Sequence, residues 1–236
     1  MPVYRLNDNE ISFPNPAFAE RNGLLAVGGD LHPDRILTAY QYGIFPWFED
    51  GGLYYWYAPD PRCVLFPEDL VVHKSMRSIF NGNKFQYTLD THFREVMEAC
   101  AGVPRYGEHG SWITPDFVAA YTDLHEAGIA HSVEVWQEGQ LVGGLYGLAI
   151  GKIFFGESMF SKVPNASKAG FITLTRALRQ AGYWLIDCQQ ETQHLLTLGA
   201  RTIPRSRFLD YLEKNRFHRT QIGQWRFSSE KGVVVF

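Results

Sequence analysis

The fold is decided by residues 131–189, which divide into HSVEVWQ (131–137), QLVGGLYGLAIG (140–151), KIFFGESMF (152–160), SKVPNAS (161–167), KAGFITLTRALRQ (168–180) and YWLIDCQ (183–189). The first three segments predict consecutive strands, because apolar residues dominate each and turn residues separate them. A loop, a helix and a further strand are expected to follow. The rest of the chain adds short helices, and this mixture predicts an α+β fold.

Polar side chains interrupt two of these apolar strands. Glu157 lies inside FFGESMF, and Asp187 and Gln189 lie inside LIDCQ. With a period of two, Phe155, Glu157 and Met159 are expected to share one face, and Asp187 is expected to face the same way as Gln189. A buried carboxylate is costly unless it is compensated, so each acid is either a satisfied structural hydrogen-bond partner or part of a catalytic site.

The helix between these strands predicts an apolar wall beside the polar residues. Phe171, Leu174 and Leu178 recur at spacings of three and four and form one stripe. A carboxylate and an amide next to such a wall suit an apolar acyl group and a reaction with an amine. An amino terminus has a pKa near ~8, so most of it is protonated at pH 7 and must be deprotonated or positioned.

The strand and helix order resembles the second half of the acyl-CoA N-acyltransferase (GNAT) fold. In that fold a glycine-rich turn before the helix holds a pyrophosphate. Pro164 and Asn165 stand at that position here. The sequence therefore predicts that coenzyme A is a poor donor, and a CoA-dependent acyltransferase is kept as a rival hypothesis, together with a non-catalytic RNA-binding module.

Length and proline spacing predict two domains. The chain has 236 residues, 45% of them hydrophobic and 15% aromatic, which supports a sizeable core. We expect a small N-terminal domain over residues 1–62 and a GNAT-like catalytic domain over residues 63–236. A helix is expected over residues 33–42, and Asp90 is expected to cap the helix that follows it.

An aromatic stretch lies in the small domain. IFPWF (44–48) and LYYWYAPDPR (53–62) flank a glycine pair and predict a loop. These rings form either a satellite core or a platform on which a base can stack.

Charge is unevenly distributed although the net charge is only −3. Residues 1–60 contain three basic and eight acidic residues, whereas residues 201–226 contain seven basic and two acidic ones. The basic segment is either a site for a phosphate backbone or a solvated helix face.

Cysteine usage and the absence of recognisable motifs predict an unexported cytoplasmic protein without a membrane segment, metal or cofactor. Cys63, Cys100 and Cys188 show no CxxC spacing, and there is no apolar run of membrane-spanning length. HExxH, GxSxG and P-loop patterns are missing from the sequence. Cys188 is interpreted as a small buried hydrophobe facing away from its two neighbours, with a nucleophilic role as the alternative.

Several long segments, which occur in order, resemble the leucyl/phenylalanyl-tRNA–protein transferase family over nearly the whole chain: NGLLAVGGDL, AYQYGIFPWF, APDPR, HKSMR, WIT, HSVEVW, LVGGLYG, FFGESMFS, NASK and LIDCQ. The resemblance implies an enzyme that moves Leu, Phe or Met from aminoacyl-tRNA to the amino terminus of proteins beginning with Arg or Lys, which marks them for degradation. The implied partners are Leu-tRNA, Phe-tRNA and such proteins, and we expect a monomer.

The resemblance also implies roles for individual residues. Gln189 would draw a proton from the incoming amine, Asp187 would polarise Gln189, and Glu157 would help to hold the amine. Trp47 and Trp112 would stack on the terminal adenine. The implied side-chain pocket comprises Leu145, Phe154, Met159, Phe171, Leu174 and Ile186.

Three further points follow from the resemblance. Lys74, Arg77 and Lys84, together with the basic C-terminal segment, are expected to bind phosphates of the acceptor stem. Leu145 stands where some members have Met, and Leu174 where some have Phe. These departures affect the expected ranking of Leu, Phe and Met and leave the expected reaction unchanged.

Overall fold

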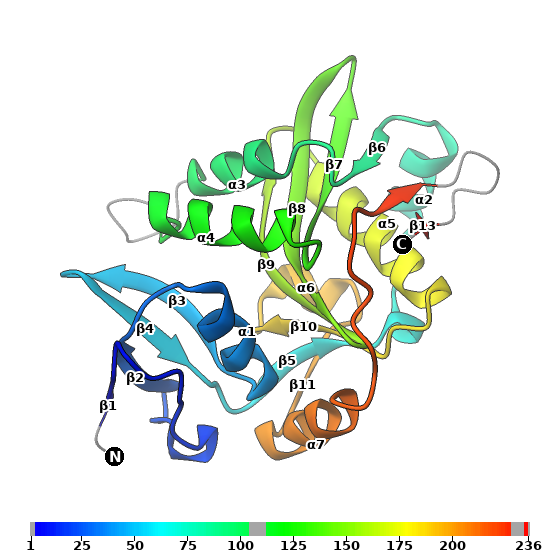
Figure 1. Cartoon of the computed structure of the whole chain (residues 1–236). Helices are drawn as coiled ribbons and strands as arrows, with labels where there is room; N and C mark the ends of the chain where they lie inside the picture. Colours follow the sequence, from blue (N-terminus) through cyan, green and yellow to red (C-terminus); the bar gives the residue numbers. More distant parts are fainter. Residues whose placement is uncertain (1–2, 104–111, 228–233, 236) are drawn as a thin grey trace.

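The computed structural model describes residues 3–103, 112–227 and 234–235, which form a small sheet beside a larger one (Figure 1). The small sheet has the order β1-β2-β4-β3. Its strands are β1 Tyr4–Leu6, β2 Leu24–Gly28, β3 Phe45–Asp50 and β4 Leu53–Tyr57. A short 3-10 helix, η1 (Pro16–Phe18), lies between β1 and β2, and helix α1 (Pro33–Gln41) lies between β2 and β3.

The aromatic stretch predicted to be a loop is a β-hairpin, so that prediction is wrong. β3 and β4 pair in antiparallel fashion, and Gly51 and Gly52 make the turn with φ values of 59° and 79°. Pro46 is tolerated because the register shifts between Pro46 and Phe48. Aromatic side chains are frequent in strands, and here that preference outweighs the neighbouring Pro and Gly residues.

Within the described residues, the larger sheet has seven strands in the order β11-β5-β10-β9-β8-β7-β6. The strands are β5 Arg62–Leu65, β6 Gln86–Leu89, β7 Ala130–Gln137, β8 Gln140–Ile150, β9 Ile153–Ser161, β10 Leu185–Gln189 and β11 Arg201–Ile203. β7, β8 and β9 are antiparallel neighbours, whereas β10 runs parallel to β9 after the helical crossover. The expected α+β class and the expected succession of strands, helix and strand are confirmed.

Helices cover both faces of the larger sheet (Figure 1). The helical segments are α2 Lys74–Asn81, α3 Phe93–Ala101, α4 Pro115–Glu126, α5 Ala166–Gln180, α6 Gln193–Thr197, α7 Arg205–Asn215 and the 3-10 helix η2 Pro67–Asp69. Core residues of α3 and α4 join the core of α1 and the small sheet, while α5 packs in a second core on the opposite face. A short pair, β12 (Arg226–Phe227) and β13 (Val234–Val235), follows. None of the helices in the described part of the chain combines the length and the apolar character needed to span a bilayer.

Two irregularities break the alternation of side chains that a regular strand predicts. The register between β8 and β9 shifts next to Gly156, and as a result Phe155 and Met159 pack in the two opposite cores. The register between β10 and β5 shifts between Asp187 and Gln189. The predictions that Phe155 and Met159 share a face, and that Asp187 points the same way as Gln189, are therefore wrong.

The two strands also separate. β9 and β10 pair only as far as Phe155 and Asp187, whereas β9 continues along β8 to Ser161. An opening between neighbouring strands is the consequence, and the polar residues of both strands lie beside it.

Asp90 does not cap the helix, contrary to expectation. His92 precedes α3 at the N-cap position, and Asp90 is buried with a φ of 56°. Its carboxylate accepts hydrogen bonds from the backbone N–H groups of Ser132 and Trp225, at 2.8 and 2.7 Å, and contacts His131 Nδ1 at 2.8 Å. Asp90 thus ties the C-terminal segment to the large sheet.

Candidate active site

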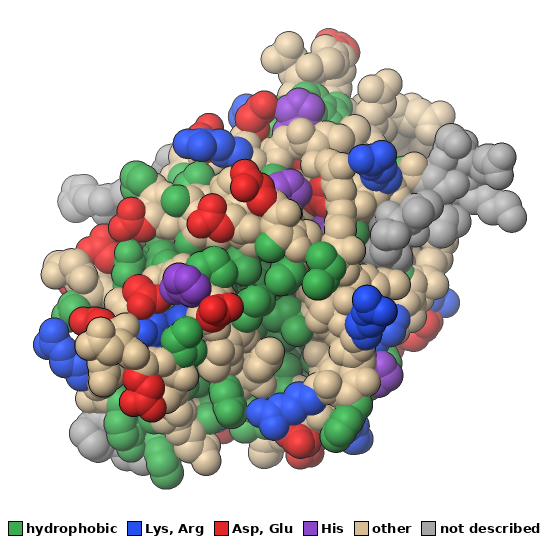
Figure 2. Space-filling view, in the orientation of Figure 1, with side chains coloured by type: hydrophobic (Ala, Val, Ile, Leu, Met, Phe, Trp, Pro, Cys, Tyr) green, Lys and Arg blue, Asp and Glu red, His purple; other side chains and the backbone are tan. Residues whose placement is uncertain are grey.

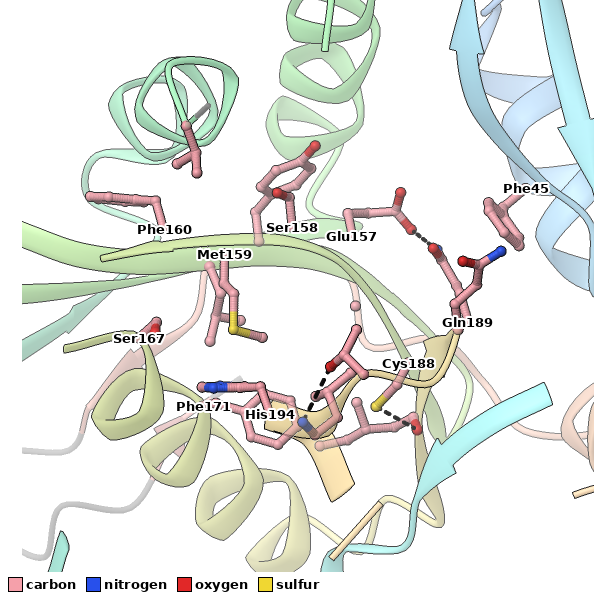
Figure 3. A pocket seen from close by; sticks show the side chains of 18 of the residues that line it. Phe45, Glu157, Ser158, Met159, Phe160, Ser167, Phe171, Cys188, Gln189 and His194 are labelled. Carbon is pink, nitrogen blue, oxygen red and sulfur yellow. Dashed lines mark hydrogen bonds between the residues drawn. The ribbon is translucent and has the colours of Figure 1, made fainter. Parts of the chain in front are cut away.

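A cavity of about 540 Å³ opens where β9 and β10 separate (Figure 3). Among the residues that line it are the following predicted site residues: Glu157, Gln189, Trp47, Trp112, Leu145, Phe154, Met159, Phe171 and Ile186. They come from the small sheet, the segment before α4, and β8, β9, β10 and α5. The structure brings all of these together, whereas Asp187 and Leu174 do not line the cavity.

One part of the cavity is apolar. Leu145, Phe154 and Ile186 are buried there, and Met159 and Phe171 lie beside them (Figure 3). Leu174 is buried in the same core without reaching the cavity. The reason is its place on α5: Leu174 lies about 4.5 Å further along the helix axis than Phe171, away from the N-terminal end of the helix that borders the cavity.

Glu157 forms the polar part of the cavity together with Gln189. Gln189 Nε2 donates a 2.8 Å hydrogen bond to Glu157 Oε1 (Figure 3). Tyr40 donates to the same oxygen at 2.6 Å, and Tyr121 donates to Oε2 at 3.3 Å. The two tyrosine oxygens lie 2.7 Å apart, within hydrogen-bond distance of each other. These bonds hold the carboxylate of Glu157 in one orientation.

Burial raises the pKa of Glu157 to about 7, and the negative charge of Asp187 acts in the same direction. The hydrogen bonds from Tyr40 and Tyr121 and the charge of Arg62 oppose this rise without cancelling it. A carboxyl group with a pKa near neutrality can accept and return a proton at physiological pH. Glu157 therefore has the properties of a general base.

Asp187 is turned away from the cavity and paired with Arg62. Both side chains are buried, and Arg62 Nε and Nη2 donate to the two carboxylate oxygens at 2.8 and 2.6 Å. Asp187 Oδ1 also accepts a 2.9 Å hydrogen bond from the backbone N–H of Gln189. The pair thereby fixes the backbone at Gln189, whose φ is 61°, a conformation that costs energy for a residue other than glycine.

Sequence reasoning missed three residues of this arrangement: Arg62, Tyr40 and Tyr121. Arg62 is the last residue of the expected N-terminal domain, and Tyr40 falls within the helix expected over residues 33–42. Tyr40 and Tyr121 are 0% exposed, and a buried tyrosine hydroxyl needs a polar partner. That requirement, applied to AYQYG (39–43) beside a strand with an internal Glu, is the signal that could have linked them.

The two tryptophans approach the cavity from different elements. Trp47 lies on β3 in edge contact with Tyr57, with ring centroids 4.8 Å apart. Trp112 lies just before α4 in edge contact with Phe117 at 5.5 Å. Both are half-buried and line the cavity.

Cys188 also lines the cavity (Figure 3). It was predicted to face away from both of its neighbours, but the register shift between Asp187 and Gln189 turns this part of β10. Its Sγ lies 3.8 Å from the carbonyl oxygen of Ile186. The neighbouring Cys63 side chain and burial raise the pKa of the Cys188 thiol well above its ordinary value.

Comparison of the chain with known proteins identifies one family. Residues 64–213 match the family "Leucyl/phenylalanyl-tRNA protein transferase", and residues 29–60 match its N-terminal domain. A leucyl/phenylalanyl-tRNA–protein transferase of Pseudomonas aeruginosa is 54% identical over 89% of this chain and 94% of its own. One from Azotobacter vinelandii is 56% identical over 88% of this chain and 92% of its own.

Solved structures show a more distant similarity of general layout. A GCN5-related N-acetyltransferase from Kribbella flavida covers 70% of this chain and 59% of its own, with a TM-score of 0.38 and 13% identity. The L-PGS structure from Bacillus licheniformis covers 69% of this chain and 51% of its own, with a TM-score of 0.38 and 13% identity. On the family match and the identity to its relatives, the chain belongs to the leucyl/phenylalanyl-tRNA–protein transferase family and is an enzyme with that transferase activity.

Proposed function

We propose that this enzyme moves Leu, Phe and, to a lesser extent, Met from aminoacyl-tRNA to the α-amino group of proteins that begin with Arg or Lys, forming a peptide bond that marks them for N-degron proteolysis. One observation carries the proposal: an apolar pocket ends at a half-buried carboxylate hydrogen-bonded to an amide. The pocket suits the side chain of the donor, and the polar end suits the acceptor amine. An aminoacyl ester is already activated, so positioning and proton transfer suffice.

We assign to Glu157 the role of the general base that accepts a proton from the acceptor amine. In its ionised form Glu157 takes a proton from the acceptor ammonium group, and the freed nitrogen attacks the ester carbonyl carbon. The bond between that carbon and the ribose oxygen then breaks as the new C–N bond is completed. Glu157 returns its proton to the ribose oxygen, and the nitrogen loses its second surplus proton to solvent, which leaves a neutral peptide bond and a free ribose hydroxyl. The side-chain N–H of Gln189 is engaged with Glu157, which leaves its Oε1 to accept a hydrogen bond from the amine.

Gln189 and Asp187 therefore have positioning roles in this proposal. A neutral amide is a poor base, so Gln189 orients the amine while the carboxylate of Glu157 binds the proton. Asp187 acts through the backbone N–H of Gln189 and contacts neither substrate. The paired Arg62 holds the Asp187 carboxylate in place.

The shape of the pocket supports selection among donors. Apolar side chains line one part of the cavity, and we assign to this part a donor side chain with an unbranched Cβ and a bulky apolar end. A β-branched Ile or Val places a methyl group against the wall, which costs about 1–3 kcal/mol of discrimination.

Exposed basic residues on α2 support a site for the acceptor stem. Lys74 and Arg77 are exposed there, and Lys84 follows shortly after. Basic residues of the C-terminal segment are partly engaged elsewhere: Arg201 pairs with Asp69 at 2.7 Å, and Arg216 pairs with Glu213 at 3.2 Å. On the face shown in Figure 2, Lys and Arg side chains are scattered among Asp and Glu side chains. We therefore place the phosphate contacts at α2.

We also propose a division into a small domain of residues 1–62 and a catalytic domain of residues 63–236, and a monomeric enzyme of the cytoplasm. The small sheet ends at Tyr57 and the first strand of the large sheet begins at Arg62, which supports a boundary between these positions.

A transfer assay tests the proposed function. Purified enzyme given Leu-tRNA charged with labelled Leu is expected to label a peptide that begins with Arg and to leave a matched peptide that begins with Glu unlabelled. Transfer to both peptides, or to neither, contradicts the proposal.

Alanine variants of the two tryptophans test the adenine site. Trp47→Ala and Trp112→Ala are each expected to raise the KM for aminoacyl-tRNA by about tenfold or more, because stacking contributes ~1–3 kcal/mol per base. The kcat is expected to change much less. Trp184→Ala is the control, since Trp184 packs against His218 and is not among the residues that line the cavity. Steady-state kinetics with varied Leu-tRNA measure both parameters, and a fall in kcat at unchanged KM contradicts the assignment.

A further inference from the structure

Two cysteines meet behind the catalytic residues. Cys63 lies on β5 and Cys188 on the neighbouring antiparallel strand β10. Gln189 pairs with Cys63, and the register shift between Asp187 and Gln189 leaves Cys188 as the additional residue at this point. Both side chains belong to the core on the α5 side of the large sheet, and neither cysteine forms a disulfide in the structure.

The pair is reachable through the cavity. Cys188 lines the cavity and is partly exposed, whereas Cys63 is fully buried. A small oxidant that enters the cavity therefore meets Cys188 first. Among the described residues, Cys63 is the thiol placed to react with the oxidised Cys188. Cys100 lies on α3 in the other core.

We propose that Cys63 and Cys188 form a reversible disulfide on exposure to hydrogen peroxide, and that this disulfide suppresses aminoacyl transfer. The regulatory part of the proposal rests on the proposed function, because its effect is measured on the transfer reaction. The disulfide itself is a statement about the two thiols and is tested without that reaction.

The chemistry balances with hydrogen peroxide as the oxidant. The Cys188 sulfur attacks one peroxide oxygen, the O–O bond breaks, and a sulfenic acid and one water are formed. The Cys63 sulfur then attacks the Cys188 sulfur, an S–S bond forms as the S–O bond breaks, and a second water leaves. Two electrons pass from the thiols to the peroxide, and the two thiol protons end in water.

The pKa values of the two thiols are shifted in opposite directions. The neighbouring Cys188 side chain lowers the pKa of Cys63, which favours the thiolate needed for the second step. The raised pKa of Cys188 makes the first step slow. The disulfide is therefore expected to accumulate under sustained exposure to peroxide.

Formation of the bond is expected to disturb the residues on either side of it. A disulfide brings the two sulfur atoms to ~2.05 Å from each other, much closer than hydrogen-bonded thiols. Cys188 precedes Gln189, whose side-chain amide must keep its hydrogen bond to Glu157. Cys63 follows Arg62, which donates hydrogen bonds to Asp187. Pulling β10 towards β5 at this point displaces the Gln189 amide, so kcat falls while the tryptophan site for the tRNA end is left in place.

The experiment compares the full-length enzyme before and after hydrogen peroxide. Peptide mapping by mass spectrometry is expected to find residues 63 and 188 linked, and the transfer rate is expected to fall at least tenfold and to recover with dithiothreitol. Cys63→Ala removes the second thiol, and Cys100→Ala is the matched control at a buried cysteine outside the pair. We expect the control to behave as the wild type does, and Cys63→Ala to show neither the link nor the dithiothreitol-reversible loss.

Two results overturn the proposal. One is oxidised wild-type enzyme in which no link between residues 63 and 188 is found. The other is an equal, dithiothreitol-reversible loss in Cys63→Ala, which would place the loss outside the disulfide. A reduced enzyme that transfers no Leu to the Arg peptide contradicts the proposed function instead, and peptide mapping of the wild type still decides whether the disulfide forms.

Discussion

Glu157→Gln is expected to lower kcat for transfer to an Arg peptide by about 10²–10⁴-fold, the usual range for loss of a general acid–base group. Gln keeps the size of the side chain and can still accept a hydrogen bond from Tyr40, but it cannot take up a proton at neutral pH. Single-turnover kinetics with saturating Leu-tRNA and peptide measure the effect. Glu126→Gln, an exposed position at the end of α4, is the control and is expected to have normal kcat.

The pH dependence of kcat tests whether Glu157 is the group that accepts the proton. The pKa of Glu157 is raised to about 7, so its basic form is scarce at pH 6 and dominant at pH 8. The kcat of the wild type is therefore expected to rise with pH through an apparent pKa near 7, and Glu157→Gln is expected to lose this rise. A pH profile that keeps its rise near 7 in Glu157→Gln assigns the proton to a different group.

The raised pKa of Glu157 also makes the stability of the folded protein depend on pH. Glu157 has a higher pKa in the folded protein than its ordinary value of 4.5, so folding favours its neutral form. The cost of keeping it ionised is absent below pH 4.5 and complete above pH 7. Glu157→Gln is thus expected to melt at a higher temperature than the wild type at pH 8, with the difference shrinking at pH 5. Lost activity in a more stable protein separates a catalytic defect from misfolding.

Much of this architecture follows from local patterns in the chain. The strands of residues 131–160 and the crossover helix before LIDCQ were predicted correctly, because alternation, turn residues and helical spacing are properties of neighbours in sequence. The residues of the apolar pocket were expected from the family resemblance alone, and all of them except Leu174 line the cavity.

The parts that escaped prediction depend on contacts between distant segments. Tyr40 and Glu157 are 117 residues apart, and Arg62 and Asp187 are 125 apart. Neither pairing alters the spacing of apolar residues along the sequence. A bulge is equally hidden, since one additional residue at Glu157 or Cys188 reverses the facing of those that follow without changing the composition of the strand. Asp187 was misplaced for this kind of reason.

Breaking the buried ion pair is expected to have the largest effect on stability. Asp187→Ala leaves the Arg62 guanidinium without its carboxylate in a site where both side chains are at most 1% exposed. An uncompensated buried charge costs about 3–5 kcal/mol, which corresponds to a decrease in Tm of roughly 6–20 °C for a chain of this size. Asp69→Ala breaks the exposed pair with Arg201 and is expected to cost less than about 1 kcal/mol. Thermal unfolding of the three proteins measures the contrast.

Replacing both partners then distinguishes positioning from stability. In the variant Arg62→Met with Asp187→Leu, no charge is left unpaired, and such apolar replacements are often close to neutral in stability. The Tm is therefore expected to return towards that of the wild type. The kcat is expected to stay low, because the backbone N–H of Gln189 has lost the carboxylate that holds it and the strained φ of Gln189 is no longer fixed. Recovery of kcat together with Tm would mean that the pair serves stability alone and that Gln189 keeps its place without it.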